Sequence, residues 1–96
     1  MDEFAVQRVL TAVDDVPAGR VASYGDIGRV AGVGPRQVGA ILRDRGHEVA
    51  WWRVVSAAGE LPPHLRAEAT VHWDAEGIGH ADGRVDVRRH RLRRQG

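Results

Sequence analysis

The sequence predicts a single, mainly α-helical domain with short strands, of the winged-helix-like helix-turn-helix type. The chain has 96 residues, which is the size of one small domain. Apolar residues in its first half recur at the three- and four-residue intervals that are typical of helices. Two of the expected helices are separated by the three-residue turn Gly32-Val33-Gly34, and this spacing is typical of a helix-turn-helix motif.

The first helix is expected to run from Asp2 to about Asp15. Five apolar residues at helical spacing are expected to face the core: Phe4, Val6, Val9, Leu10 and Val13. The turn residues 17–19 (PAG) end this helix, and residues 20–22 are expected to be short and extended.

The two helices of the helix-turn-helix have clear beginnings. The second helix is expected from Tyr24 to about Ala31, with Ser23 as the N-cap and Asp26 completing a capping box. The third is expected from Pro35, which suits the first helical position, to about Arg45, with Gly46 closing it. The core-facing residues expected from these two helices are Ile27, Val30, Ala31, Val38, Ile41 and Leu42.

The second half of the chain has weaker patterns. Val49–Val55 reads as an extended segment, and residues 56–59 as a loop. Leu65–Glu76 is expected to be a helix that Gly77 caps, with three residues facing inward: Ala69, His72 and Trp73. Val85 and Val87 are expected in a last short strand. The domain is expected to span residues 1–87, followed by an Arg-rich, solvated C-terminal tail at 88–96.

Two of the three tryptophans stand side by side in the segment VAWWRVV. Neighbouring side chains of an extended segment point to opposite faces, so one indole is expected in the core. The other needs a different role, and a wall for a flat ligand is one candidate. The segment alone does not choose between Trp51 and Trp52.

Composition excludes several kinds of chemistry. The chain has no cysteine, so it has no disulfide, thiolate nucleophile or cysteine-ligated zinc. The histidines (47, 64, 72, 80 and 90) never have the i, i+4 spacing of a helical metal site, and neither serine lies in a nucleophile motif. We therefore expect no cofactor, no metal and no catalytic residue.

The arginine content of the third expected helix favours a nucleic acid as the partner, and a GC-rich genome is the alternative explanation for the absence of lysine. All 14 basic residues are arginine, and they are concentrated in residues 20–53 and 88–96. Arginine makes planar, bidentate contacts with phosphate. No apolar run is long enough to span a membrane, and the acidic N-terminus is unlike a signal peptide, so we expect a cytoplasmic location.

Four segments resemble, in order and spacing, the DNA-binding domain of the O6-alkylguanine-DNA alkyltransferases. They are 16–32 (VPAGRVASYGDIGRVAG), 34–43 (GPRQVGAILR), 50–59 (AWWRVVSAAG) and 75–78 (AEGI). In those enzymes the segment matching 50–54 reads P-C-H-R-V, and the cysteine accepts the alkyl group from a flipped guanine. Here Trp51 stands at the cysteine position and Trp52 at the histidine position, while Glu76 matches the glutamate that holds the histidine. Tryptophan in place of the cysteine is the mark of the alkyltransferase-like proteins, although those proteins usually keep the histidine.

The resemblance implies roles for individual residues. Arg36 matches the residue that enters the base stack in place of the flipped nucleotide. Tyr24 matches the residue that presses on the 3′ phosphate, Gly39 a small residue that lets the helix approach DNA, and Arg43 a phosphate contact. The DNA-binding residues are expected to be Tyr24, Arg36, Gln37, Gly39 and Arg43. The lesion pocket is expected to be formed by Trp51, Trp52, Arg53, Ser56 and Gly59, with Trp52 either in the core or at the pocket rim.

The implied function is non-enzymatic recognition of O6-alkylguanine by nucleotide flipping, which flags the lesion for nucleotide excision repair. The expected partners are double-stranded DNA containing O6-alkylguanine and nucleotide excision repair proteins, with no membrane and with a monomeric protein. Two alternatives stay open. One is a helix-turn-helix transcription regulator, and the other is a DNA-repair enzyme with an unrecognised nucleophile.

Overall fold

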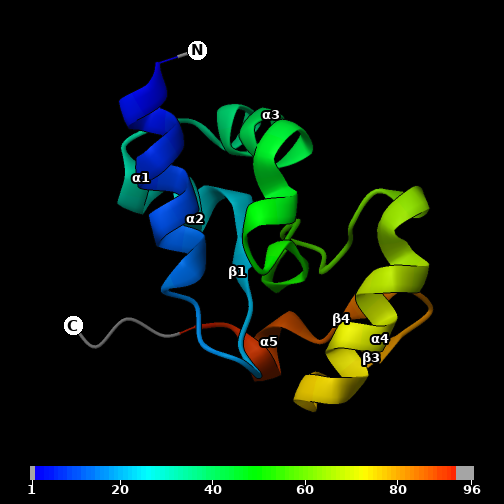
Figure 1. The fold of residues 1–96 in the computed structure, drawn as a ribbon. Coiled ribbons are helices and arrows are strands. Elements are labelled where there is room, and N and C mark those ends of the chain that lie inside the picture. Colours follow the sequence, from blue (N-terminus) through cyan, green and yellow to red (C-terminus); the bar gives the residue numbers. More distant parts are fainter. Residues whose placement is uncertain (1, 93–96) are drawn as a thin grey trace.

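The structure is a computed structural model and describes residues 2–92. Three helices, α1 (Glu3–Asp14), α2 (Tyr24–Ala31) and α3 (Pro35–Arg45), pack together at one side of the molecule, and α4 (Arg66–Glu76) lies at the other side (Figure 1). The short elements between and after them are η1 (Gly46–Glu48), η2 (Trp51–Arg53), β2 (Val54–Val55), η3 (Pro63–Leu65), β3 (His80–Ala81), β4 (Arg84–Val85) and α5 (Val87–His90). The expected mainly helical domain with short strands is therefore observed.

Helix α1 begins where the sequence predicts it, because the side chain of Asp2 accepts a hydrogen bond from the backbone N–H of Phe4. Its buried face consists of Ala5, Val6, Val9, Leu10, Ala12 and Val13. The prediction that Phe4 faces the core is wrong, since this side chain is 78% exposed. Phe4 stands two residues before Val6, and positions two apart lie on opposite sides of a helix.

The helix-turn-helix has the predicted caps. Ser23 Oγ accepts from the Asp26 N–H at 3.0 Å, and Asp26 Oδ2 accepts from the Ser23 N–H at 3.1 Å. The backbones of α2 and the turn touch closely, because a Cβ on Gly28 would lie 2.4 Å from the carbonyl oxygen of Val33. Only glycine fits there, and it fixes how α2 meets the start of α3.

One apolar side chain of α2 lies outside the core. Ile27 and Ala31 are buried as predicted, and Val38 and Ile41 of α3 are buried with them. The prediction for Val30 is wrong, because it is 55% exposed. Helix α1 covers the side of α2 that carries Ile27 and Ala31, and Val30 falls beside that contact.

Strand β1 (Ala22–Ser23) pairs in parallel with β2, with Ala22 opposite Val54 and Ser23 opposite Val55. Of the segment predicted to be extended, only Val54–Val55 is a strand, and Trp51–Arg53 forms one turn of 3₁₀ helix instead. The prediction that Trp51 and Trp52 point to opposite faces therefore does not hold. Both indoles are half-buried and meet edge to face, with ring centroids 5.8 Å apart.

A second core cluster lies between β2, α4 and the β3–β4 hairpin. It consists of Val21, Val55, Leu61, Ala69, Trp73, Ile78 and Val85. Trp73 is fully buried, and its indole N–H donates to the carbonyl oxygen of Trp52 at 2.8 Å. Gly77 ends α4 in the left-handed region at φ 71°, as predicted.

The C-terminal segment is folded onto the domain. Val85 is in β4 as predicted, but Val87 begins α5. The backbone of Val21 donates to the carbonyl of His90 at 2.9 Å and accepts from Leu92 at 2.8 Å. His90 is buried, and Arg91 forms an ion pair with Asp26. The interpretation of 88–96 as a solvated tail is therefore wrong for residues 88–92, and residues 93–96 lie outside the described residues. No helix within residues 2–92 is long and apolar enough to cross a membrane.

Candidate nucleic-acid interface

A cavity of about 560 Å³ lies between α3 and the segment that leads into α4. One wall is formed by α3 and the residues that follow it, and the facing wall by residues 61–68. Trp51 lies between these walls. The volume lies in the range of small-molecule binding sites, and the lining is mainly apolar.

Five of the ten residues predicted for DNA binding or the lesion pocket line this cavity. They are Tyr24, Arg36, Gly39, Arg43 and Trp51. They come from α2, α3 and η2, so the tertiary structure brings together side chains spread over 28 positions of the chain. Gln37 is half-buried on α3 and does not line the cavity.

Helix α3 presents its first turn to this site. Pro35 occupies the first helical position, and Arg36 follows it with an exposed side chain. Backbone N–H groups at a helix N-terminus attract phosphate, so an arginine there adds to an existing positive end. Gly39 lies one turn later, and a Cβ there would meet nothing within 4 Å. The fold itself therefore has room for a larger side chain at this position. A second molecule that lies close to α3 would need the space that only glycine leaves free.

Tyr24 is the first residue of α2, and the capping box of Ser23 and Asp26 fixes its position. Burial raises the pKa of the Tyr24 hydroxyl. The phenol therefore stays protonated at neutral pH and is able to donate a hydrogen bond to an anion.

Trp51 is held from behind by two aromatic rings. The Trp51 and Trp52 rings meet edge to face, with ring centroids 5.8 Å apart. The Trp51 and His72 rings also meet edge to face, with ring centroids 6.1 Å apart. On the other side, the Trp51 Cβ lies 3.6 Å from the position a Cβ on Gly46 would take. These contacts fix the orientation of Trp51 where it lines the cavity.

Trp52 lies behind this wall and does not line the cavity. Its indole stacks on His72 with a centroid distance of 3.6 Å and an interplanar angle of 6°. Its N–H donates to Glu76 Oε2 at 2.9 Å. Trp52 is therefore a half-buried residue that packs against the second core cluster, and its indole N–H has a hydrogen-bond partner.

Glu76 is the centre of a hydrogen-bond network that joins three segments: the α1–β1 connection, η2 and α4. It accepts from Arg53 Nη2 at 2.7 Å, from the Gly19 N–H at 3.1 Å and from Trp52. Arg53 also donates to the carbonyl of Val16 at 2.9 Å. Burial opposes ionisation of Glu76, but the hydrogen bonds from Arg53, Gly19 and Trp52 outweigh it and hold the pKa of this carboxyl below its usual range. Arg53 therefore belongs to a structural ion pair and does not line the cavity.

Ser56 and Gly59 form the turn after β2 and also lie away from the cavity. Ser56 Oγ accepts from the Glu60 N–H at 3.0 Å. Gly59 has a φ of +84°, and a Cβ there would lie 2.3 Å from the carbonyl oxygen of Val85. Both residues therefore serve the contact between this turn and β4.

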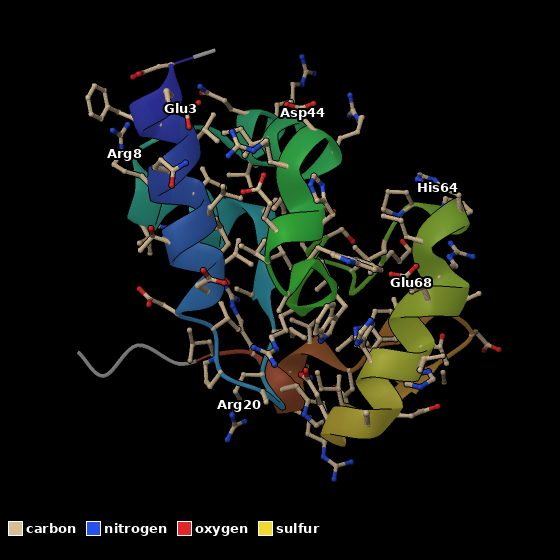
Figure 2. The ribbon with its side chains drawn as sticks, in the orientation of Figure 1. Glu3, Arg8, Arg20, Asp44, His64 and Glu68 are labelled. Carbon is tan, nitrogen blue, oxygen red and sulfur yellow. The ribbon has the colours of Figure 1, made fainter. Side chains whose placement is uncertain are left out.

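Eight lining residues were not predicted from the sequence. Leu42, Gly46 and His47 belong to the α3 wall, and the facing wall consists of Leu61, Pro62, His64, Leu65 and Glu68. Figure 2 shows His64 and Glu68 on the N-terminal half of α4 and the turn before it. Their sequence carries no binding motif, and only the docking of this segment opposite α3 places them at the site. Within residues 2–92, no group of three or more His, Asp or Glu side chains is arranged to hold a metal ion.

Comparison with known proteins gives a consistent result along the whole chain. The family model described as "6-O-methylguanine DNA methyltransferase, DNA binding domain" matches residues 5–95. The chain is 34% identical over 93 residues to a DNA base-flipping protein of Escherichia coli (strain K12), covering 88% of this chain and 71% of that protein. It is 38% identical over 65 residues to alkyltransferase-like protein 1 of Schizosaccharomyces pombe, covering 64% of this chain and 59% of that protein.

Two solved structures share the fold. One is the crystal structure of S. pombe Atl1 in complex with damaged DNA containing O6-carboxymethylguanine, with a TM-score of 0.84, 24% identity and 98% coverage of both chains. The other is a crystal structure of S. pombe ATL in complex with DNA, with a TM-score of 0.78, 26% identity and the same coverage. The predicted fold class is therefore confirmed.

Proposed function

The chain belongs to the family of the 6-O-methylguanine DNA methyltransferase DNA-binding domain, and on this premise we propose that it recognises O6-alkylguanine in double-stranded DNA. The damaged nucleotide would be flipped out of the helix into the cavity lined by Trp51. The protein binds the lesion without repairing it. Relatives named as a base-flipping protein and as an alkyltransferase-like protein support this proposal.

One observation carries the proposal: Trp51, Arg36 and Tyr24 line one cavity beside the start of α3. Flipping costs a few kcal/mol and needs a pocket for the base and a group to fill the gap in the stack. Trp51 offers a flat apolar wall, and base–aromatic contact contributes about 1–3 kcal/mol. Arg36 is exposed and extends from the N-terminal end of α3, where it would fill the gap. Tyr24 would press on the backbone phosphate, with Gly39 and Arg43 against the DNA.

The absence of transfer chemistry is part of the proposal. Trp51 stands where the alkyltransferases carry their acceptor cysteine, and the sequence contains no cysteine at all. Trp52 stands where they carry the activating histidine, and its N–H donates to Glu76. Glu76 also holds Arg53, so this carboxylate has a structural role in place of a catalytic one.

We further propose that the bound protein flags the lesion for nucleotide excision repair, acting as a cytoplasmic monomer with access to duplex DNA. A protein that keeps the lesion extrahelical without removing it needs a second system to complete repair. The five arginines of residues 88–96 would add phosphate contacts.

The test is binding to two duplexes that differ only in one O6-methylguanine. We expect tighter binding to the modified duplex and an unchanged protein mass after incubation, with the lesion retained in the DNA. Equal affinity for both duplexes would instead favour a helix-turn-helix transcription regulator. A stoichiometric gain of one methyl group on the protein would contradict the binding-only proposal.

A further inference from the structure

The cavity has one acidic wall, and it lies opposite the basic one. Among the described residues that line the cavity, Glu68 is the single acid. It lies on α4, and Figure 2 shows its side chain on the side of α4 that faces α3. Arg36 and Arg43 line the cavity from α3. The two walls therefore carry opposite charges across the space in which the base would lie.

Glu68 is one of several acids that no ion pair compensates within residues 2–92, and among these acids it is the one that lines the cavity. Within residues 2–92 it takes part in no ion pair, whereas Glu60 of the preceding loop contacts Arg66 and Arg84. Glu68 also makes no side-chain hydrogen bond to the part of the chain that the structure describes. No contact of the fold explains this carboxylate, and its lining position leaves it free to act on what enters the cavity.

We infer that Glu68 makes the site selective for the charge of the O6 substituent, so that neutral and cationic adducts bind better than anionic ones. This inference rests on the proposed function, because it needs a flipped base in the cavity. In the complex, Arg36 would fill the gap in the base stack, and Arg43 would face a backbone phosphate that neutralises it. Glu68 would then be the unneutralised charge nearest to an adduct that projects toward the α4 wall.

Two histidines that line the cavity modify the repulsion between Glu68 and an anionic adduct without reversing it. His64 lies one turn before Glu68 and also lines the cavity, as does His47 after α3. A neutral imidazole leaves the charge of Glu68 uncompensated, and a protonated one would offset it. Like charges within a few ångströms in partly solvated surroundings repel by an amount that corresponds to about a three- to tenfold change in affinity. The selectivity should increase as the salt concentration is lowered.

The experiment measures the affinity of the full chain for an unmodified duplex and for three duplexes that differ from it in one guanine. The guanine carries a methyl group, a carboxymethyl group (anionic) or a 2-aminoethyl group (cationic) on O6. We expect the carboxymethyl duplex to bind about three- to tenfold more weakly than the methyl duplex and the aminoethyl duplex to bind at least as well as it. Glu68→Gln removes the charge with little change in shape and should bring the carboxymethyl-to-methyl ratio close to one, while Glu68→Lys should invert it.

Asp44→Asn is the matched control. Asp44 is an exposed acid on α3 that does not line the cavity, and the substitution changes the net charge by the same amount as Glu68→Gln. It should shift the affinities for all three duplexes alike and leave their ratios unchanged.

The outcomes separate this inference from the proposed function. Equal wild-type affinity for the methyl duplex and for unmodified DNA would contradict the proposed function. A clear preference for the methyl duplex, with a carboxymethyl-to-methyl ratio that Glu68→Gln does not alter, would overturn the charge selection alone. The same holds if Glu68→Gln changes all three affinities by one factor, because Glu68 would then contact the base and not the adduct.

Discussion

The indole N–H of Trp52 donates to Glu76 Oε2 at 2.9 Å. The resemblance to alkyltransferases places a histidine at position 52, held by this glutamate. The tryptophan keeps the hydrogen bond to the carboxylate but has no second ring nitrogen with which to activate a nucleophile through water. In the proposed function, position 52 therefore keeps a structural contact and takes no part in chemistry. The indole of Trp52 also stacks on His72, with centroids 3.6 Å apart.

Arg36→Ala should weaken binding to a duplex with O6-methylguanine by about 1–3 kcal/mol, because no side chain would then fill the gap left by the flipped base. The melting temperature should stay close to that of the wild type, since Arg36 is exposed. Arg29→Ala, at an exposed arginine outside this cavity, is the control and should change binding much less. Early melting, or unchanged binding, of the Arg36 variant would make Arg36 a structural residue.

Trp51→Ala should reduce the preference for alkylated over normal guanine more than it reduces binding to plain DNA, because a pocket wall is lost and not a phosphate contact. Trp51→Phe should keep part of the preference. Trp51 fluorescence, measured with Trp52→Phe and Trp73→Phe as background, should change more with modified than with plain DNA. Full discrimination by Trp51→Ala would contradict the role of Trp51 as the wall of the lesion pocket.

Trp51→Cys should transfer little or no methyl group from O6-methylguanine DNA. It restores the acceptor, but its thiol should keep a pKa of about 8.5 and react poorly at neutral pH. Trp51→Cys combined with Trp52→His should transfer more, because an imidazole at position 52 would be within reach of Glu76. The measurement is the mass of the protein after incubation, and equal transfer by both variants would show that Glu76 does not activate the histidine.

The stability of the fold should fall at acid pH because of Glu76. Its pKa is below the usual value in the folded protein, so the unfolded chain binds the proton more readily. The stabilisation is therefore present above the unfolded pKa of about 4.3 and is lost as the pH falls through the folded pKa. Glu76→Gln should lower the free energy of unfolding at pH 7 by about 1–3 kcal/mol and flatten this acid dependence.

The control for that measurement is Glu68→Gln on the same helix, where the carboxylate is exposed and takes part in no ion pair within residues 2–92. Its free energy of unfolding should keep the acid dependence of the wild type. If the free energy of unfolding of the Glu76 variant falls at acid pH as steeply as that of the wild type, the network around Glu76 does not control the pH dependence of folding.

Two truncations should separate the structural and the electrostatic roles of the C-terminus. Removing residues 93–96 takes away two arginines and should lower affinity for modified and plain DNA alike, reducing the slope of log affinity against log salt by up to about 2. Removing 88–96 should in addition lower the melting temperature, because Val21 loses its hydrogen bonds to His90 and Leu92. An unchanged salt slope in the shorter truncation would mean that Arg93 and Arg94 do not contact DNA.

Local chemistry determined the first half of the molecule. The caps of α1 and α2, the glycine turn and Pro35 at the start of α3 depend on residues within four positions of one another, so the sequence predicted these boundaries correctly. The errors at Phe4 and Val30 have a different cause, because helical spacing alone does not say which side a neighbouring helix covers. The order of the family segments indicated Tyr24, Arg36, Gly39, Arg43 and Trp51, which all line one cavity.

Only the tertiary structure decided what surrounds Trp51. The turn Trp51–Arg53 is a 3₁₀ helix, and in it Trp52 and Arg53 both donate to Glu76, which stands more than 20 positions later in the chain. The placement of Glu68 opposite α3 depends on the docking of α4 through the buried Trp73, and the folding of residues 88–92 depends on Val21. These contacts join distant segments, and their free energy comes from burial and from hydrogen bonds that no local pattern contains.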